Sequence, residues 1–96
     1  MKKIKPVHPG EYLRELLDEL DVSAYALAKH IGVSQMRLSH ILRGQRPLSA
    51  DIALLLERAF GQSAQYWINL QARYDLDIAQ DRISVRALSR IAPLAA

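Results

Sequence analysis

Apolar residues recur at spacings of three and four along most of the chain, a pattern typical of amphipathic helices. Five stretches show this period, at residues 9–20, 23–31, 34–43, 49–60 and 63–80. A weaker pattern covers residues 84–92, and Pro93 would end a helix there. No stretch alternates with a period of two, so no sheet is expected. The pattern predicts an all-α bundle of five to six helices with short connections.

Glycine and serine residues stand at the ends of these stretches. Gly32, Gly44 and Gly61 each follow an apolar stretch, where a residue that accepts a positive φ can end a helix. Pro9 suits the first turn of the first helix. The other four helices are expected to begin at serines, which are good N-cap residues: Ser23, Ser34, Ser49 and Ser63.

The helices are expected to share one core, since 96 residues make a single domain. Half of the residues are hydrophobic and 24% are charged, which is ordinary for a globular protein and too apolar for a disordered one. The apolar faces of the first and fifth helices are predicted to comprise Tyr12, Leu13, Leu16, Leu17 and Leu20, and Trp67, Leu70 and Tyr74.

Several functional classes are disfavoured by the composition. Without cysteine, disulfides, thiolate zinc sites and a cysteine nucleophile are excluded. The longest apolar run, at residues 52–56, is far shorter than the roughly 20 residues of a membrane span. His8, His30 and His40 lack carboxylates at ligand spacing, so no metal or other cofactor is expected. No nucleophile motif or phosphate loop is present, and we expect a soluble cytoplasmic protein that is not an enzyme.

The net charge of +3 is concentrated in one part of the chain. Residues 1–20 and 49–96 each sum to zero, whereas residues 21–48 carry four cations against Asp21 alone. A local basic excess is typical of proteins that bind a polyanion, although a solvated surface is the alternative. The positions of the cations must therefore decide between the two.

Residues 24–44 carry the pattern of a helix-turn-helix. Ala28 is small, as needed where the second helix crosses closely over the first, and Gly32 takes a turn that a Cβ would resist. Such a motif places its second helix, here residues 34–43, in the DNA major groove. The residues expected to face inward and set the angle between the helices are Val33, Leu38 and Ile41.

The outward residues of the second helix are mostly polar, and none is acidic. Gln35 can read adenine through two hydrogen bonds, and Arg37 is expected to reach a phosphate or a guanine edge. Met36 fits equally a thymine methyl contact or a partly buried core position. The predicted DNA contacts are Ser34, Gln35, Met36, Arg37, Ser39, His40, Arg43 and Arg46.

The remaining contacts have different expected roles. His40, one turn after Met36, is expected to meet a base edge. Ser34 caps the helix whose backbone N–H groups would point at a phosphate. Arg43 and Arg46 flank Gly44 and are expected to bind phosphates, which adds affinity without sequence choice.

These residues resemble the helix-turn-helix of the lambda-repressor-like (XRE) class. Three flanking motifs extend the resemblance, namely His8-Pro9-Gly10-Glu11, Ser49-Ala50-Asp51 and the stretch from Tyr66 to Leu76. Together they resemble the HigA (or VapI) antitoxin family over about residues 7–80. The stretch from Tyr66 to Leu76 is the most specific part, because general phage-type repressors lack it.

The resemblance implies a homodimeric repressor that binds the near-palindromic operator of its own toxin–antitoxin operon. It also implies a small RelE/HigB-like toxin partner, an mRNA-cleaving protein that the antitoxin neutralises by binding. The implied organisation is an N-terminal arm (1–8), a DNA-binding core (9–62) and a helical dimerisation extension (63–96). Two alternatives stay open: a protein that mainly sequesters the toxin, and a stand-alone regulator with no toxin.

Overall fold

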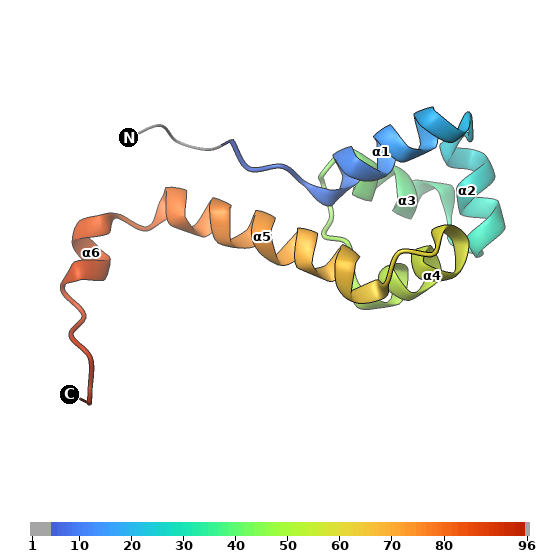
Figure 1. Ribbon diagram of the computed structural model, residues 1–96. Helices are drawn as coiled ribbons and strands as arrows, with labels where there is room; N and C mark the ends of the chain where they lie inside the picture. The colour runs from blue at the N-terminus through green and yellow to red at the C-terminus, as the bar shows by residue number, and fades with distance from the viewer. Residues whose placement is uncertain (1–4, 96) are drawn as a thin grey trace.

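The computed structural model describes residues 5–95, in which every regular element is a helix (Figure 1). The elements are α1 (Pro9–Leu20), α2 (Ala24–Ile31), α3 (Gln35–Leu42), α4 (Ala50–Phe60), α5 (Ala64–Arg82) and α6 (Val85–Ser89). The first four helices pack with the beginning of α5, and the rest of α5 extends away with α6 at its far end (Figure 1). The predicted all-α fold is confirmed, with α6 shorter than the predicted stretch 84–92.

The four serines predicted as N-caps stand at the starts of α2 to α5, and three of them cap their helix with a side-chain hydrogen bond. The Oγ atoms of Ser23, Ser34 and Ser63 each accept a hydrogen bond of 3.0–3.1 Å from the backbone N–H three residues later. Ser49 stands at the N-cap of α4 but makes no such bond, because its hydroxyl donates to the side chain of Asp51. The start of α4 is therefore held by side chains instead of by a backbone cap.

The core lies where α1 to α4 meet the first turns of α5. Full burial of one such side chain contributes about 1.5–3 kcal/mol. The fully or nearly fully buried apolar residues are Leu13, Leu17, Leu27, Ala28, Leu38, Ile41, Leu42, Leu48, Ile52, Ala53, Leu56 and Trp67.

Two residues of the predicted core face of α1 lie at the surface. Tyr12 is 40% exposed and Leu20 is 52% exposed, so the inner face of α1 is narrower than predicted. The prediction for Tyr12 was wrong because the helices that pack against α1 cover only the side that carries Leu13 and Leu17. Leu20 ends the helix, where no neighbouring element covers it fully.

The beginning of α5 belongs to the core. Trp67, predicted on the apolar face of this helix, is 1% exposed, and Gln71, which was not predicted there, is 8% exposed. From Gln80 to residue 95, every described residue is exposed. Residues 1–4 of the predicted arm and residue 96 lie outside the described residues, whereas His8 of that arm is buried. None of the described helices is both long and apolar enough to cross a membrane.

Candidate nucleic-acid interface

The turn between α2 and α3 is held by hydrogen bonds to one carbonyl. The backbone N–H groups of Gly32 and Val33 donate to the oxygen of Ala28 at 2.9 and 3.0 Å, and Gly32 has a φ of 78°. Ala28 is 2% exposed, as expected for the place where the two helices cross. This turn and the buried residues Leu38 and Ile41 hold α3 with its opposite side in solvent.

The outward side of α3 carries the predicted DNA contacts. Gln35, Met36, Arg43 and Arg46 are exposed, and Ser34 caps the helix at its exposed end. Met36 is 70% exposed, so of its two interpretations the partly buried core position is wrong. The two contacts of intermediate exposure in the middle of the helix are Ser39 and His40.

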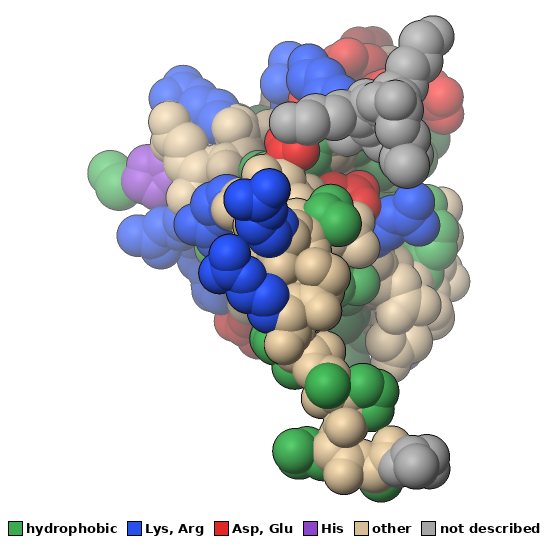
Figure 2. Space-filling view, turned by 90° about the vertical axis from the view of Figure 1, so that its left-hand side faces the viewer, with side chains coloured by type: hydrophobic (Ala, Val, Ile, Leu, Met, Phe, Trp, Pro, Cys, Tyr) green, Lys and Arg blue, Asp and Glu red, His purple; other side chains and the backbone are tan. Residues whose placement is uncertain are grey.

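The chain has no acidic residue between Asp21 and Asp51, so the surface of α2 and α3 is free of carboxylates from its own segment. Figure 2 faces the end of the molecule that carries α6, so α2 and α3 lie toward the back of this view; Lys and Arg side chains gather at its left and centre, and most Asp and Glu side chains lie at its upper right. Positive charge on an exposed helix favours contact with a phosphate backbone.

The side chain of Arg37 is paired with residues at the start of α4. Its Nη2 donates to Oδ2 of Asp51 at 2.8 Å and to Oγ of Ser49 at 3.2 Å, which ties the start of α3 to the start of α4. Hydrogen bonds from the Ser49 hydroxyl and from Arg37 lower the pKa of Asp51 to about 2. This ion pair is exposed and screened by solvent, so it orients the two side chains more than it stabilises the fold. Arg37 therefore orients α3, and a phosphate or base contact by the same guanidinium stays a prediction.

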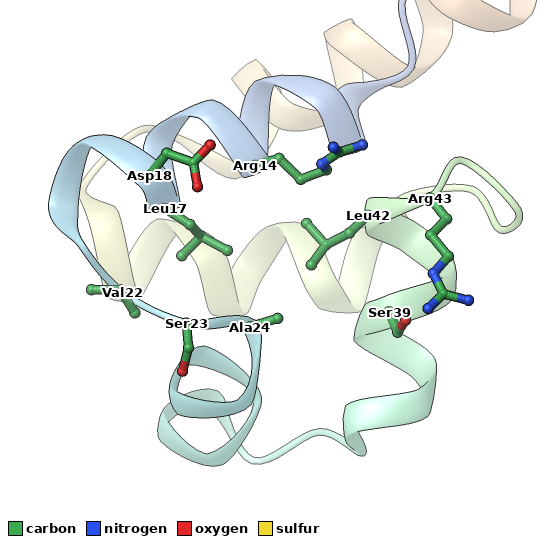
Figure 3. A pocket seen from close by; sticks show the side chains of 9 residues that line it. All are labelled: Arg14, Leu17, Asp18, Val22, Ser23, Ala24, Ser39, Leu42 and Arg43. Carbon is green, nitrogen blue, oxygen red and sulfur yellow. The ribbon is translucent and has the colours of Figure 1, made fainter.

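A groove beside α3 brings in a cation that the sequence patterns did not indicate. It has a volume of about 440 Å³ and lies between α1, the start of α2 and the end of α3 (Figure 3). Arg14 and Asp18 of α1 line one side, and Ser39 and Arg43 line the other. Arg14 was missed because the charges of residues 1–20 sum to zero, although the helical position of Arg14 turns it toward Arg43.

The loop of residues 43–48, between α3 and α4, carries Arg43 and Arg46. The backbone N–H groups of Gln45 and Arg46 donate to the carbonyl of His40 at 2.8 and 3.2 Å. At the far end of this 43–48 loop, the N–H of Leu48 donates to Oε1 of Gln71 in α5 at 2.7 Å. The two cations are therefore presented by a loop with an ordered backbone.

Comparison with known proteins agrees with this geometry. The helix-turn-helix family matches residues 13–67, which is more than half of the chain. Virulence-associated protein I of Dichelobacter nodosus is 49% identical over 84 residues, covering 85% of this chain and 78% of that protein.

Two solved structures of HigA proteins have nearly the same fold. A HigA-family addiction module antidote protein from Coxiella burnetii matches with a TM-score of 0.89 and 40% identity over 94% of this chain and 99% of that one. The Pseudomonas aeruginosa antitoxin HigA, solved with the higBA promoter, matches with a TM-score of 0.87 and 45% identity over the same shares. The chain therefore belongs to the helix-turn-helix family and, within it, to the group that contains the HigA antitoxins and virulence-associated protein I.

Proposed function

We propose that this protein is the antitoxin of a type II toxin–antitoxin module and represses its own operon by binding the operator. The observation that carries the proposal is the outward side of α3, which is mostly polar, exposed or half-exposed, and free of acidic residues. The Pseudomonas aeruginosa relative, which shares this fold at 45% identity, was solved with promoter DNA. The proposed role is therefore binding, and we expect no catalytic activity.

Recognition divides between base contacts and phosphate contacts. Gln35, Met36 and His40 lie on the side of α3 that would face base edges in the major groove. Arg43 and Arg46 would hold the backbone at the end of α3, and Arg14 would hold it across the groove in Figure 3. Sequence choice would then come from α3, and most of the affinity from the arginines.

We propose that the protein binds DNA as a homodimer formed by α5 and the residues after it. A monomer leaves apolar side chains of this segment in water: Leu76, Ile83, Val85, Leu88, Ile91 and Leu94 are each between 47% and 107% exposed. A two-fold dimer would bury them and could place two copies of α3 about 34 Å apart, one turn of duplex. A monomer in analytical ultracentrifugation at tens of micromolar, with and without operator, would contradict the dimer.

The toxin partner would be a small RelE-like protein encoded beside this gene. Neutralisation is tested by co-expressing the neighbouring gene product with this protein and measuring growth. No rescue and no co-purification would favour the stand-alone regulator. If rescue occurs while operator binding is weak and unspecific, sequestration of the toxin is the main activity.

The decisive experiment is fluorescence anisotropy on the DNA upstream of the protein's own start codon, titrated with salt beside a scrambled duplex. We expect a preference of about a thousandfold or more and a steep salt dependence. Equal weak binding to both duplexes would refute the autorepressor.

Two variants separate the predicted contacts in that assay. Arg43→Ala should weaken binding to both duplexes alike and lower the salt slope by about one. Gln35→Ala should cost about 1–3 kcal/mol on the operator alone. Arg58→Ala and Gln65→Ala, exposed positions on α4 and α5, are the matched controls and should bind like the unsubstituted protein.

A further inference from the structure

His8 is a buried histidine that has no part in the predicted DNA contacts. It is 6% exposed and directly precedes α1. Three parts of the chain meet at its ring: the start of α1, the 43–48 loop and the middle of α5. This position connects the loop that carries Arg43 and Arg46 to the rest of the molecule.

The two ring nitrogens of His8 serve different elements. Nδ1 accepts a hydrogen bond of 2.9 Å from the backbone N–H of Gly10 and so caps α1. A neutral imidazole that accepts at Nδ1 carries its proton on Nε2. The backbone of Arg46 lies near the ring and favours the protonated form, and Nε2 is the nitrogen left to face it. His8 therefore links α1 to the 43–48 loop.

The ring of His8 also packs between the loop and α5. A Cβ placed on Gly44 would lie 3.5 Å from Cγ of His8, so the loop backbone passes directly beside the ring. The ring of Tyr74 meets it edge-on with a centroid separation of 4.9 Å and an interplanar angle of 74°. An aromatic pair of this geometry has a preferred orientation, which limits rotation of the imidazole.

The far end of the 43–48 loop, at Leu48, is also held by α5. Gln71 accepts from the N–H of Leu48 and donates through Nε2 to Oδ1 of Asp75 at 2.9 Å. Burial lowers the pKa of His8, while the Arg46 backbone, Asp75 of α5 and Glu11 of α1 oppose this. The titratable groups that face the ring are Asp75, Glu11 and Tyr74. Because burial outweighs the opposing causes, the pKa of His8 is lowered and its imidazole is neutral.

We propose that His8 is a positioning residue for operator binding: its ring holds the 43–48 loop against α1 and α5, so that Arg43 and Arg46 face the phosphate backbone together. This inference rests on the proposed operator binding. Neither arginine has a side-chain ion pair among the interactions described for residues 5–95. Arg43 is held at the C-cap of α3 by the bond from its N–H to the carbonyl of Ser39, whereas the position of Arg46 depends on the backbone of the loop. Loss of the ring would free the loop between its anchors at His40 and Gln71.

The test is His8→Asn, with His30→Asn as the matched control. The Asn oxygen can still accept from the Gly10 N–H, so the cap of α1 is kept while the ring that touches Gly44 and Tyr74 is removed. His30 is exposed on α2 and contributes nothing to the loop. Both variants are compared with the unsubstituted protein for melting temperature, and by anisotropy on operator and scrambled duplexes at several salt concentrations.

We expect His8→Asn to lower affinity for both duplexes about tenfold or more and to reduce the salt slope by up to about 1.8, since each lost phosphate contact removes about 0.9. His30→Asn should change neither quantity. A lower melting temperature with an unchanged salt slope in the folded protein would mean that His8 only stabilises the fold, and would overturn the proposal.

A second variant covers the case in which His8→Asn does not fold. Tyr74→Leu leaves His8 in place and removes its edge contact, and a smaller loss of salt slope in the same direction is expected. An unchanged slope in Tyr74→Leu would overturn the role of α5 in holding the loop. If the unsubstituted protein fails to prefer its operator, the proposed function itself is refuted. If it binds while both variants match it, only the positioning role is refuted.

Discussion

Gly10→Ala is a substitution for which helix propensity and tertiary packing predict opposite signs. Gly10 lies in the first turn of α1, where alanine would be preferred by up to about 1 kcal/mol on propensity alone. In the structure, a Cβ at this position would lie 2.2 Å from the carbonyl oxygen of Ile41 and 3.0 Å from Cα and the oxygen of Leu42. The start of α1 therefore rests directly on the backbone at the end of α3.

The size of the effect follows from these distances. Cβ atoms do not approach non-bonded heavy atoms closer than 3.0 Å. To bring the 2.2 Å contact to that distance, α1 and α3 must separate by about 0.8 Å or more. The oxygen of Ile41 cannot rotate away freely, because it accepts the N–H of Gly44 at 3.0 Å. Overpacking of this kind costs about 1–3 kcal/mol, which exceeds the gain in propensity. At about 4–8 °C per kcal/mol for a domain of this size, this cost corresponds to a fall in melting temperature of about 4–24 °C, from which the smaller gain in propensity is subtracted.

The assay is thermal unfolding followed by circular dichroism, with urea unfolding as an independent measure of the free energy. Glu11→Ala is the control, since Glu11 is the exposed neighbour of Gly10 in the same turn. A melting temperature for Gly10→Ala equal to or above that of the unsubstituted protein would refute the reasoning. It would mean that α1 does not sit on the end of α3 as closely as the structure has it.

Three further predictions concern the polar contacts. Gln71→Leu leaves the buried N–H of Leu48 without a partner and should lower the free energy of unfolding in urea by about 1–3 kcal/mol, whereas Gln65→Leu at an exposed site should change it by less than about 0.5 kcal/mol. The pKa of Asp51 in the folded protein, about 2, lies below its ordinary value of 3.8. Its contribution to the free energy of unfolding is therefore complete above about pH 3.8 and is lost as the pH falls through about 2. Asp51→Asn should remove this loss from a plot of unfolding free energy against pH. The lowered pKa of His8 means that the unfolded chain takes up a proton first as the pH falls below 6.5, so stability should decline there; His8→Asn should reduce that decline, and an equal decline in both proteins would contradict a buried neutral ring.

Helix positions were predicted within about two residues for α1 to α5. The reason is local: helix hydrogen bonds join residues four apart, and a cap such as Ser34 or Gly32 acts within three or four residues of itself. α6 is the exception, ending at Ser89 instead of near residue 92. It has no buried residue, so no tertiary contact extends it to Pro93.

The outward residues of α3 could also be predicted from the sequence, because they all lie on one helix and in the turn that follows. The place of Arg14 in the groove and the pairing of Arg37 with Asp51 could not be predicted in this way. Arg14 reaches the groove only because α1 packs beside α3, and Arg37 meets Asp51 only because α4 begins next to α3. Contacts between residues twelve or more apart depend on how helices pack, and periodicity carries no information about that.

The contribution of the sequence alone thus consists of the helices, their caps, the absence of acidic residues around α3 and the exposed polar side of that helix. Tertiary structure decided the rest: that Gln71 joins Trp67 in the core, that the backbone of Ile41 leaves no room for a Cβ at residue 10, and that the ring of His8 lies beside the 43–48 loop. The physical reason is the range of the interactions. Helix formation and capping involve neighbours in the chain, whereas burial and steric exclusion arise only when distant segments are brought together.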